Sequence, residues 1–112
     1  MKDFLVLIRE PDGRKTKPTE EFQKEHQQHW KAWFEKYGKL GKVAGGKPLT
    51  LNGAVISRTG DHVEEHPYYI GEEVVGGYLL LKADDMNDAI FMMKECPVYE
   101  ADGFVEIREV MN

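Results

Sequence analysis

The stretch VEEHPYYIGEEVVGGYLLLKA, residues 63–83, decides the fold of this chain. It ends in the most apolar run of the sequence, Tyr78-Leu79-Leu80-Leu81, which lacks the alternation of a half-buried strand and is too short for an isolated helix. This run therefore predicts a strand with both faces buried. Gly76 and Gly77 precede it, and glycine permits a backbone conformation or a close approach that a Cβ would resist.

A second strand of the same kind, FLVLI, occupies residues 4–8. Two strands that are apolar on both faces, in a chain of 112 residues, indicate a sheet that is covered on both sides. The chain has only two helical segments, and two helices on one side of the sheet leave its other side open. We expect the same face of a second copy to cover that side, giving a homodimer.

The two predicted helices cover residues 16–37 and 86–95. Thr16 or Thr19 can cap the first helix, and Asp84 or Asp85 can cap the second. Apolar and imidazole side chains recur along the first helix at steps of three and four residues, namely Phe22, His26, His29 or Trp30, Trp33 and Tyr37. This stripe is expected to face the sheet.

The remaining segments complete a small α+β domain. Residues 41–49 are expected to form a tight loop, residues 54–57 a short strand, residues 61–65 an extended segment and residues 104–110 a last strand. The order is β-α-β-(β)-β-α-β, which predicts a ferredoxin-like fold with a four-stranded antiparallel sheet in a single domain, residues 1–112.

Strand alternation assigns side chains to the two sides of this sheet. The side toward the helix residues Phe22, Trp30 and Trp33 is predicted to carry Leu5, Leu7, Leu79, Leu81, Val105 and Ile107. The side toward the second copy is predicted to carry Phe4, Val6, Ile8, Tyr78 and Leu80.

Several motifs resemble the YCII-related (DGPF) family. His66-Pro67-Tyr68, then Glu72-Glu73 and Gly76-Gly77-Tyr78, are similar to its D-G-P-[FY]…K-E…G-G-Y pattern. Trp30-x-x-Trp33, the GKVAGGKPL run and the closing V-E-I-R-E-V also match in the family's order. The resemblance covers nearly the whole chain, and it implies a dimeric α/β barrel in which two sheets pack face to face.

Composition excludes several classes of function. The net charge of −5 argues against a nucleic-acid partner, which normally meets a basic face. No segment approaches the roughly 20 apolar residues of a membrane span. Cys96 is the only cysteine, so neither an internal disulfide nor a cysteine metal cluster is expected. The protein is expected in the cytoplasm, without a cofactor.

His29 and His26 are the first candidate catalytic residues, with His29 as the expected base, because a histidine on or beside the apolar stripe can serve as a general base near neutral pH. The resemblance implies a partner for such a helix histidine, since some branches of the family pair it with an acidic residue. Glu65 and His66 are the expected polar partners. The alternative is a histidine that only hydrogen-bonds to backbone or water.

Other candidates lie on extended segments. His62, Glu64 and His66 would share one face of a strand and could bind Zn²⁺, but their spacing is wide and a charged edge strand is the simpler interpretation. Arg108, with Glu106, could hold the carboxylate of a ligand in the cavity between two sheets, or the two could form an internal ion pair. Tyr68 and Tyr78 complete the predicted ligand-binding set.

These residues support two hypotheses. The first is a small-molecule-binding barrel that acts as an acid/base, lyase-like enzyme through His29. The second is a non-catalytic module that binds a ligand or a protein partner, because no complete catalytic motif is visible.

Overall fold

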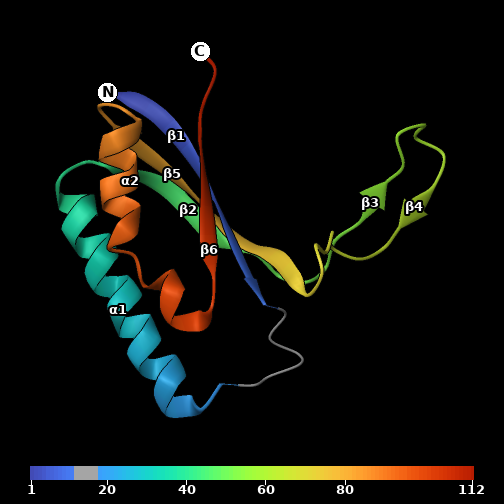
Figure 1. The fold of residues 1–112 in the computed structure, drawn as a ribbon, viewed down its shortest axis with the longest axis horizontal. Coiled ribbons are helices and arrows are strands. Elements are labelled where there is room, and N and C mark those ends of the chain that lie inside the picture. Colours follow the sequence, from blue (N-terminus) through green and yellow to red (C-terminus); the bar gives the residue numbers. More distant parts are fainter. Residues whose placement is uncertain (12–17) are drawn as a thin grey trace.

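The computed structural model describes residues 1–11 and 18–112 (Figure 1). Its main sheet is built from β1 (Lys2–Pro11), β2 (Val43–Pro48), β5 (Glu73–Ala83) and β6 (Phe104–Glu109). The other elements are α1 (Glu20–Lys39), β3 (Val55–Ile56), β4 (Val63–Glu64), α2 (Met86–Lys94) and a 3₁₀ helix, η1 (Pro97–Ala101).

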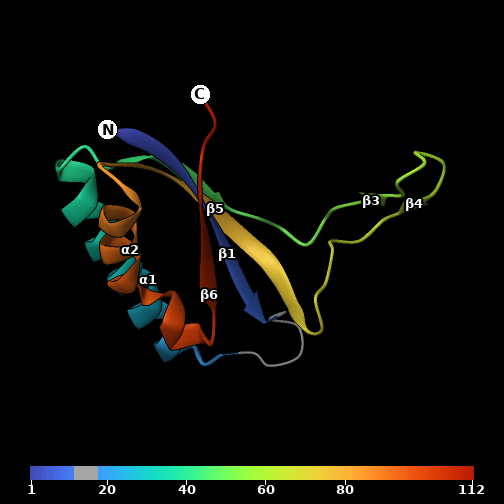
Figure 2. The same ribbon diagram turned by 45° about the horizontal axis from the view of Figure 1, so that its top comes forward.

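The four long strands form one antiparallel sheet in the order β2-β5-β1-β6, which confirms the predicted ferredoxin-like arrangement. Both helices and η1 lie on the same side of this sheet, as Figures 1 and 2 show. No helix of residues 1–11 and 18–112 lies on the opposite side. None of the helices in the described part of the chain is long and apolar enough to cross a membrane.

The fourth strand of the sheet is not the one expected. The predicted loop at residues 41–49 contains β2, which pairs with β5, whereas the predicted strand at residues 54–57 belongs to a separate β3–β4 hairpin. Hydrophobicity does not mark β2, because it is an edge strand containing Gly45, Gly46 and Pro48. Gly46 is required there, since a Cβ would lie 2.6 Å from the carbonyl oxygen of Tyr78.

The hairpin β3–β4 projects away from the sheet, at the opposite end of the molecule from α1 (Figures 1 and 2). Ile56 and Val63 are more than half exposed on it. We call residues 49–72, which include this hairpin, the arm.

The side assignment of β1 was wrong, and that of β5 and β6 was right. Phe4 and Val6 are fully buried on the helix side, where they pair with Leu81 and Leu79 of β5. Leu5 and Leu7 alternate with them and pair with Leu80 and Tyr78, so they lie on the open side. The run FLVLI contains no polar residue that would show which of its alternate side chains face the helices.

The helix stripe packs on the sheet as predicted. Trp33 and Tyr37 are buried in the core, and Trp30 packs against it. The core also contains Ala89, Met92 and Met93 of α2. Val105 and Ile107 of β6 pack against the core from the sheet.

Side chains cap both helices at predicted positions. The N–H of Phe22 donates to Thr19 Oγ1 at 3.1 Å at the start of α1. The N–H of Asp88 donates to Asp85 Oδ1 at 2.8 Å at the start of α2. Such caps satisfy amide groups that a helix cannot bond internally. Thr16, the other expected cap of α1, lies outside the described residues.

Candidate functional site

A groove runs between α1 and the helix side of the sheet. One part of it, of about 750 Å³, is bordered by Glu10, His26 and Glu100. The adjoining part, of about 620 Å³, is bordered by Trp30 and Phe34 of α1 and by Gly46 and Gly77 of the sheet. Glu10 and Gln27 border both parts, so the two form one continuous groove. Each is within the range of about 300–1,000 Å³ that is usual for small-molecule sites.

A β-bulge places Glu10 in this groove. In the β1–β5 register Ile8 opposes Gly77 and Arg9 opposes Val75, which leaves Gly76 as the extra residue. Bulges re-aim the side chains beside them. A Cβ at Gly76 would overlap the carboxyl group of Glu10. The first glycine of the Gly76-Gly77 pair therefore makes room for a carboxyl group.

The environment of Glu10 favours its neutral form. Burial removes water from the carboxyl group and raises the pKa of Glu10, and the nearby His26 opposes that rise only in part. Among the described residues, no hydrogen bond to the Glu10 carboxyl is recorded.

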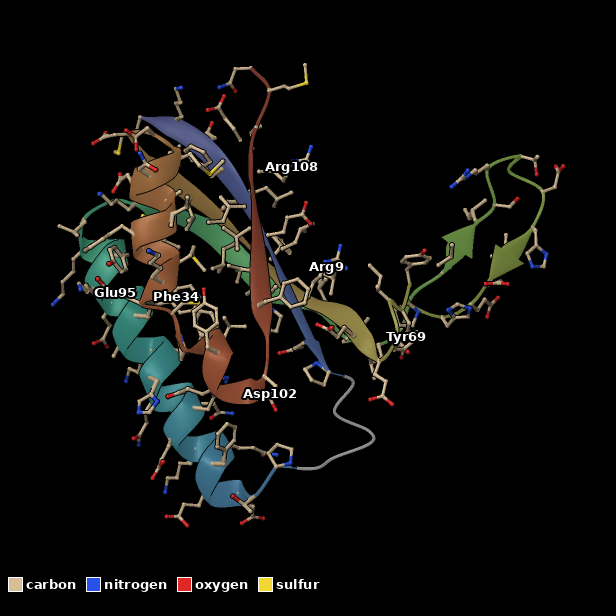
Figure 3. The ribbon with its side chains drawn as sticks, viewed as in Figure 1. Arg9, Phe34, Tyr69, Glu95, Asp102 and Arg108 are labelled. Carbon is tan, nitrogen blue, oxygen red and sulfur yellow. The ribbon has the colours of Figure 1, made fainter. Side chains whose placement is uncertain are left out.

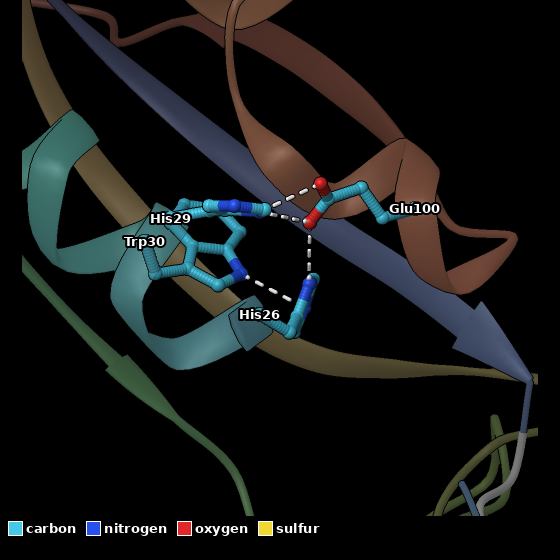
Figure 4. A network of polar contacts seen from close by, with 4 residues as sticks. All are labelled: His26, His29, Trp30 and Glu100. Carbon is cyan, nitrogen blue, oxygen red and sulfur yellow. Dashed lines mark hydrogen bonds and ion pairs between the residues drawn. The ribbon is translucent and has the colours of Figure 1, made fainter. Parts of the chain in front are cut away.

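The other carboxylate of the groove, Glu100 of η1, bridges two histidines of α1 (Figure 4). His29 Nδ1 lies 2.7 Å from Glu100 Oε2, and His26 Nδ1 lies 3.0 Å from Glu100 Oε1. The hydrogen bonds from His29 and His26 hold the pKa of Glu100 below its usual range. Glu100 is thus kept ionised.

The indole of Trp30 fixes the tautomer of neutral His26. Trp30 Nε1–H can only donate, and it lies 3.2 Å from His26 Nε2. His26 Nε2 therefore carries the lone pair, and Nδ1 carries the proton that it donates to Glu100. Both ring nitrogens of His26 are engaged. By contrast, His29 has no bond recorded at Nε2 among the described residues, and its side chain is 53% exposed.

Glu10 and Glu100 border the same part of the groove, and their pKa values are shifted in opposite directions. Two carboxyl groups whose environments separate their pKa values are suited to different roles in proton transfer. Glu10 can hold and release a proton, while Glu100 remains an anion that orients the two imidazoles.

A pH dependence of stability follows from the raised pKa of Glu10. The stabilisation due to its neutral form is complete below the unfolded-state pKa and is lost as pH rises through the higher folded-state pKa. We expect Glu10→Gln, which stays neutral, to gain stability relative to the parent between about pH 3.5 and about pH 8. Urea titrations at the two pH values measure this gain. If Glu10→Gln and the parent differed in free energy of unfolding by the same amount at both pH values, the result would contradict the raised pKa of Glu10.

The structure gives His29 a different acidic partner from the expected ones. His29 pairs with Glu100, whereas Glu65 and His66 lie in the arm, at the other end of the molecule (Figure 1). Within one chain these residues do not converge. Tyr68 is also in the arm and is largely exposed. Tyr78 borders the groove, but strand alternation directs its side chain to the open side.

The predicted residues of β6 also lie on the open side of the sheet. Figure 3 labels Arg9 on β1 and Arg108 on the neighbouring β6. Glu106 lies 3.8 Å from the Arg9 guanidinium and 3.5 Å from that of Arg108. The structure thus shows the internal ion pair that was the alternative interpretation of Arg108 and Glu106.

The candidate metal ligands of the arm contact one another in pairs. Glu64 lies 3.5 Å from His62 Nε2 and 3.0 Å from His66 Nε2. A hydrogen bond to the carbonyl of Pro67, with help from Glu64, raises the pKa of His66. In the described parts of the chain, no three His, Cys, Asp or Glu side chains are grouped so that they could hold a metal ion.

Sequence reasoning missed Glu10 and Glu100. Glu10 continues the helix-side series Phe4, Val6 and Ile8 at steps of two, so the correct phase of β1 would have revealed it. No sequence signal links Glu100 to α1, because the contact depends on how η1 packs.

Comparison with known proteins gives a family and a fold. The model of the YCII-related domain matches residues 4–112. No curated protein matches the chain significantly in sequence. A similar solved structure is a 5-chloro-2-hydroxyhydroquinone dehydrochlorinase from Burkholderia phenoliruptrix, in complex with 2,5-dihydroxybenzoquinone. It is 16% identical, with a TM-score of 0.51 over 93% of this chain and 90% of that one, which shows a shared fold.

Proposed function

This chain belongs to the YCII-related family, and from that premise we propose that it binds a small organic molecule in the groove under α1 and transfers a proton to or from it. The similar structure is that of an enzyme with a small ring compound bound, which is consistent with such a role. The observation that carries the proposal is the presence of Glu10 and Glu100, with oppositely shifted pKa values, on one groove.

The residues have separate roles in this proposal. Glu10 exchanges the proton with the ligand, because its partly buried carboxyl group lies where the two parts of the groove meet. Glu100 fixes the orientation of His26 and His29. The proposed second base is His29, which borders neither part of the groove but whose Nδ1 is held by Glu100 in the way that a carboxylate commonly orients a catalytic imidazole.

Deuterium exchange tests proton transfer without a known substrate. The protein is incubated in D₂O with pools of small carbonyl compounds, and loss of their C–H signals is followed by NMR. We expect the parent to exchange at least one compound. Glu10→Gln should slow that exchange by about 100-fold or more, because general acid–base groups contribute factors of that order. His29→Ala measures the contribution of the second base.

Arg108→Gln is the matched control, because this side chain lies on the other side of the sheet. It should exchange at the parental rate. If Glu10→Gln is as active as the parent, Glu10 is not the acid–base group. If compounds bind without any exchange or turnover, the second hypothesis, a non-catalytic ligand-binding module, replaces the first.

The assembly that we propose is a homodimer formed through the open side of the sheet, in the cytoplasm. Leu5, Leu7, Tyr78 and Leu80 share that side, and Leu80 is 39% exposed. A second copy would remove this apolar surface from water. The groove lies on the helix side, so each copy would keep its own site.

A further inference from the structure

The part of the groove beyond Glu10 has a wall of aromatic rings and an apolar floor that includes two glycines. We call it the aromatic chamber and define it by Ile8, Trp30, Phe34, Gly46, Gly77 and Leu79. The Trp30 and Phe34 rings lie 5.6 Å apart on α1, with 32° between their planes. The orientation of Trp30 is fixed, because its N–H is engaged by His26.

Two glycines and two apolar side chains form the floor. Gly77 pairs with Ile8, and Gly46 pairs with Leu79, so all four positions belong to the helix side of the sheet. A Cβ at Gly46 would lie 2.8 Å from Leu79 Cδ2, so the Leu79 side chain takes up the space beside Gly46. A space between ring faces and this apolar floor fits an aromatic ring.

An unpaired cation borders the chamber, although the chain as a whole has a net charge of −5. It is Lys31 of α1, which forms no ion pair with an acidic side chain of the described residues, whereas Lys36 and Lys42 each do. Lys47 of β2 also borders the chamber, but it pairs with Tyr78, so strand alternation directs its side chain to the open side of the sheet. An unneutralised ammonium group favours an anion at the mouth of the chamber.

We propose that the aromatic chamber binds a flat aromatic ring that carries an anionic substituent, with the ring against Trp30 and Phe34 and the anion toward Lys31. The inference rests on the proposed function, because it takes this ring to be the part of the ligand that is presented to Glu10. It names a substrate class, aromatic acids and acidic phenols. It also places the site on the helix side of the sheet rather than between two sheets.

Salicylate is a suitable probe, and isothermal titration calorimetry measures its binding to the full chain. Phenol lacks the carboxylate, and cyclohexanecarboxylate lacks the aromatic ring. We expect salicylate to bind at least about fivefold more tightly than either. Lys31→Gln should weaken salicylate binding about fivefold, and Phe34→Leu about threefold. Phe34 is partly exposed, so this variant is expected to fold.

Lys24→Gln and Arg108→Gln are the controls, the first on an exposed position of α1 and the second on the open side of the sheet. Both should bind salicylate like the parent. Failure of salicylate to bind, equal binding of either control compound, or weakening by Arg108→Gln but not by Lys31→Gln would each overturn the inference. None of these outcomes changes the deuterium-exchange result for Glu10→Gln, so the proposed acid–base function stands or falls separately.

Discussion

Replacing Trp33 by alanine is expected to destabilise the protein by about 3–5 kcal/mol. The indole is 4% exposed, and it packs in the core between α1, α2 and the sheet. Its Nε1–H donates to the carbonyl oxygen of Met92 at 3.0 Å, so the substitution also removes a buried hydrogen bond that joins the two helices. Urea titration monitored by circular dichroism gives the free energy of unfolding.

Phe91→Ala is the matched control, because this aromatic side chain on α2 is 63% exposed. It should change the free energy of unfolding by less than about 0.5 kcal/mol. A loss below about 1 kcal/mol for Trp33→Ala would contradict the placement of Trp33 between the two helices and the sheet.

The sequence alone predicted the inward face of those elements in which apolar and polar residues recur at regular intervals. The apolar stripe of α1 fixed the inward face of that helix, because side chains three and four residues apart share one face. The alternation of Val105 and Ile107 with polar neighbours fixed the phase of β6. The order of helices and strands then left the ferredoxin-like arrangement as the natural topology.

Elements without a period were harder to assign. FLVLI is apolar at every position, so its two faces could be told apart only by its register with β5. β2 contains glycines and a proline, and it owes its strand conformation to pairing with Leu79 and Leu80 rather than to its own hydrophobicity. Tertiary pairing overrode local propensity in β2, and in β1 it decided which side chains face the helices.

The candidate site was predictable only in part. His26 and His29 stood out, because histidine is rare on an apolar stripe and titrates near neutral pH. Their partner Glu100 is more than 70 residues away in the chain, and no motif in the sequence around Glu100 indicates that it contacts α1. Glu10 depends on the bulge at Gly76, which is a property of the paired strands and not of either strand alone.

The open side of the sheet carries a row of apolar side chains on β1 and β5, with charged side chains beside it on β6. Leu5 pairs with Leu80, and Leu7 pairs with Tyr78, which places four large side chains on two central strands. Glu106 and Arg108 flank this row on β6. An isologous contact places the same surface of two copies against each other, so the apolar rows can meet in the middle while the charged groups stay at the rim.

We therefore expect light scattering at micromolar concentration to give about twice the chain mass of 12.9 kDa. Leu80→Glu should shift the mass to that of one chain, because it would bury a carboxylate in the interface without a partner. In a single chain this position is already 39% exposed, so the fold should tolerate the change. Leu40→Glu, at the exposed C-terminal cap of α1, should remain dimeric. A parent protein that is monomeric at this concentration and on dilution would overturn the barrel assembly, while the groove under α1 would remain intact in each chain.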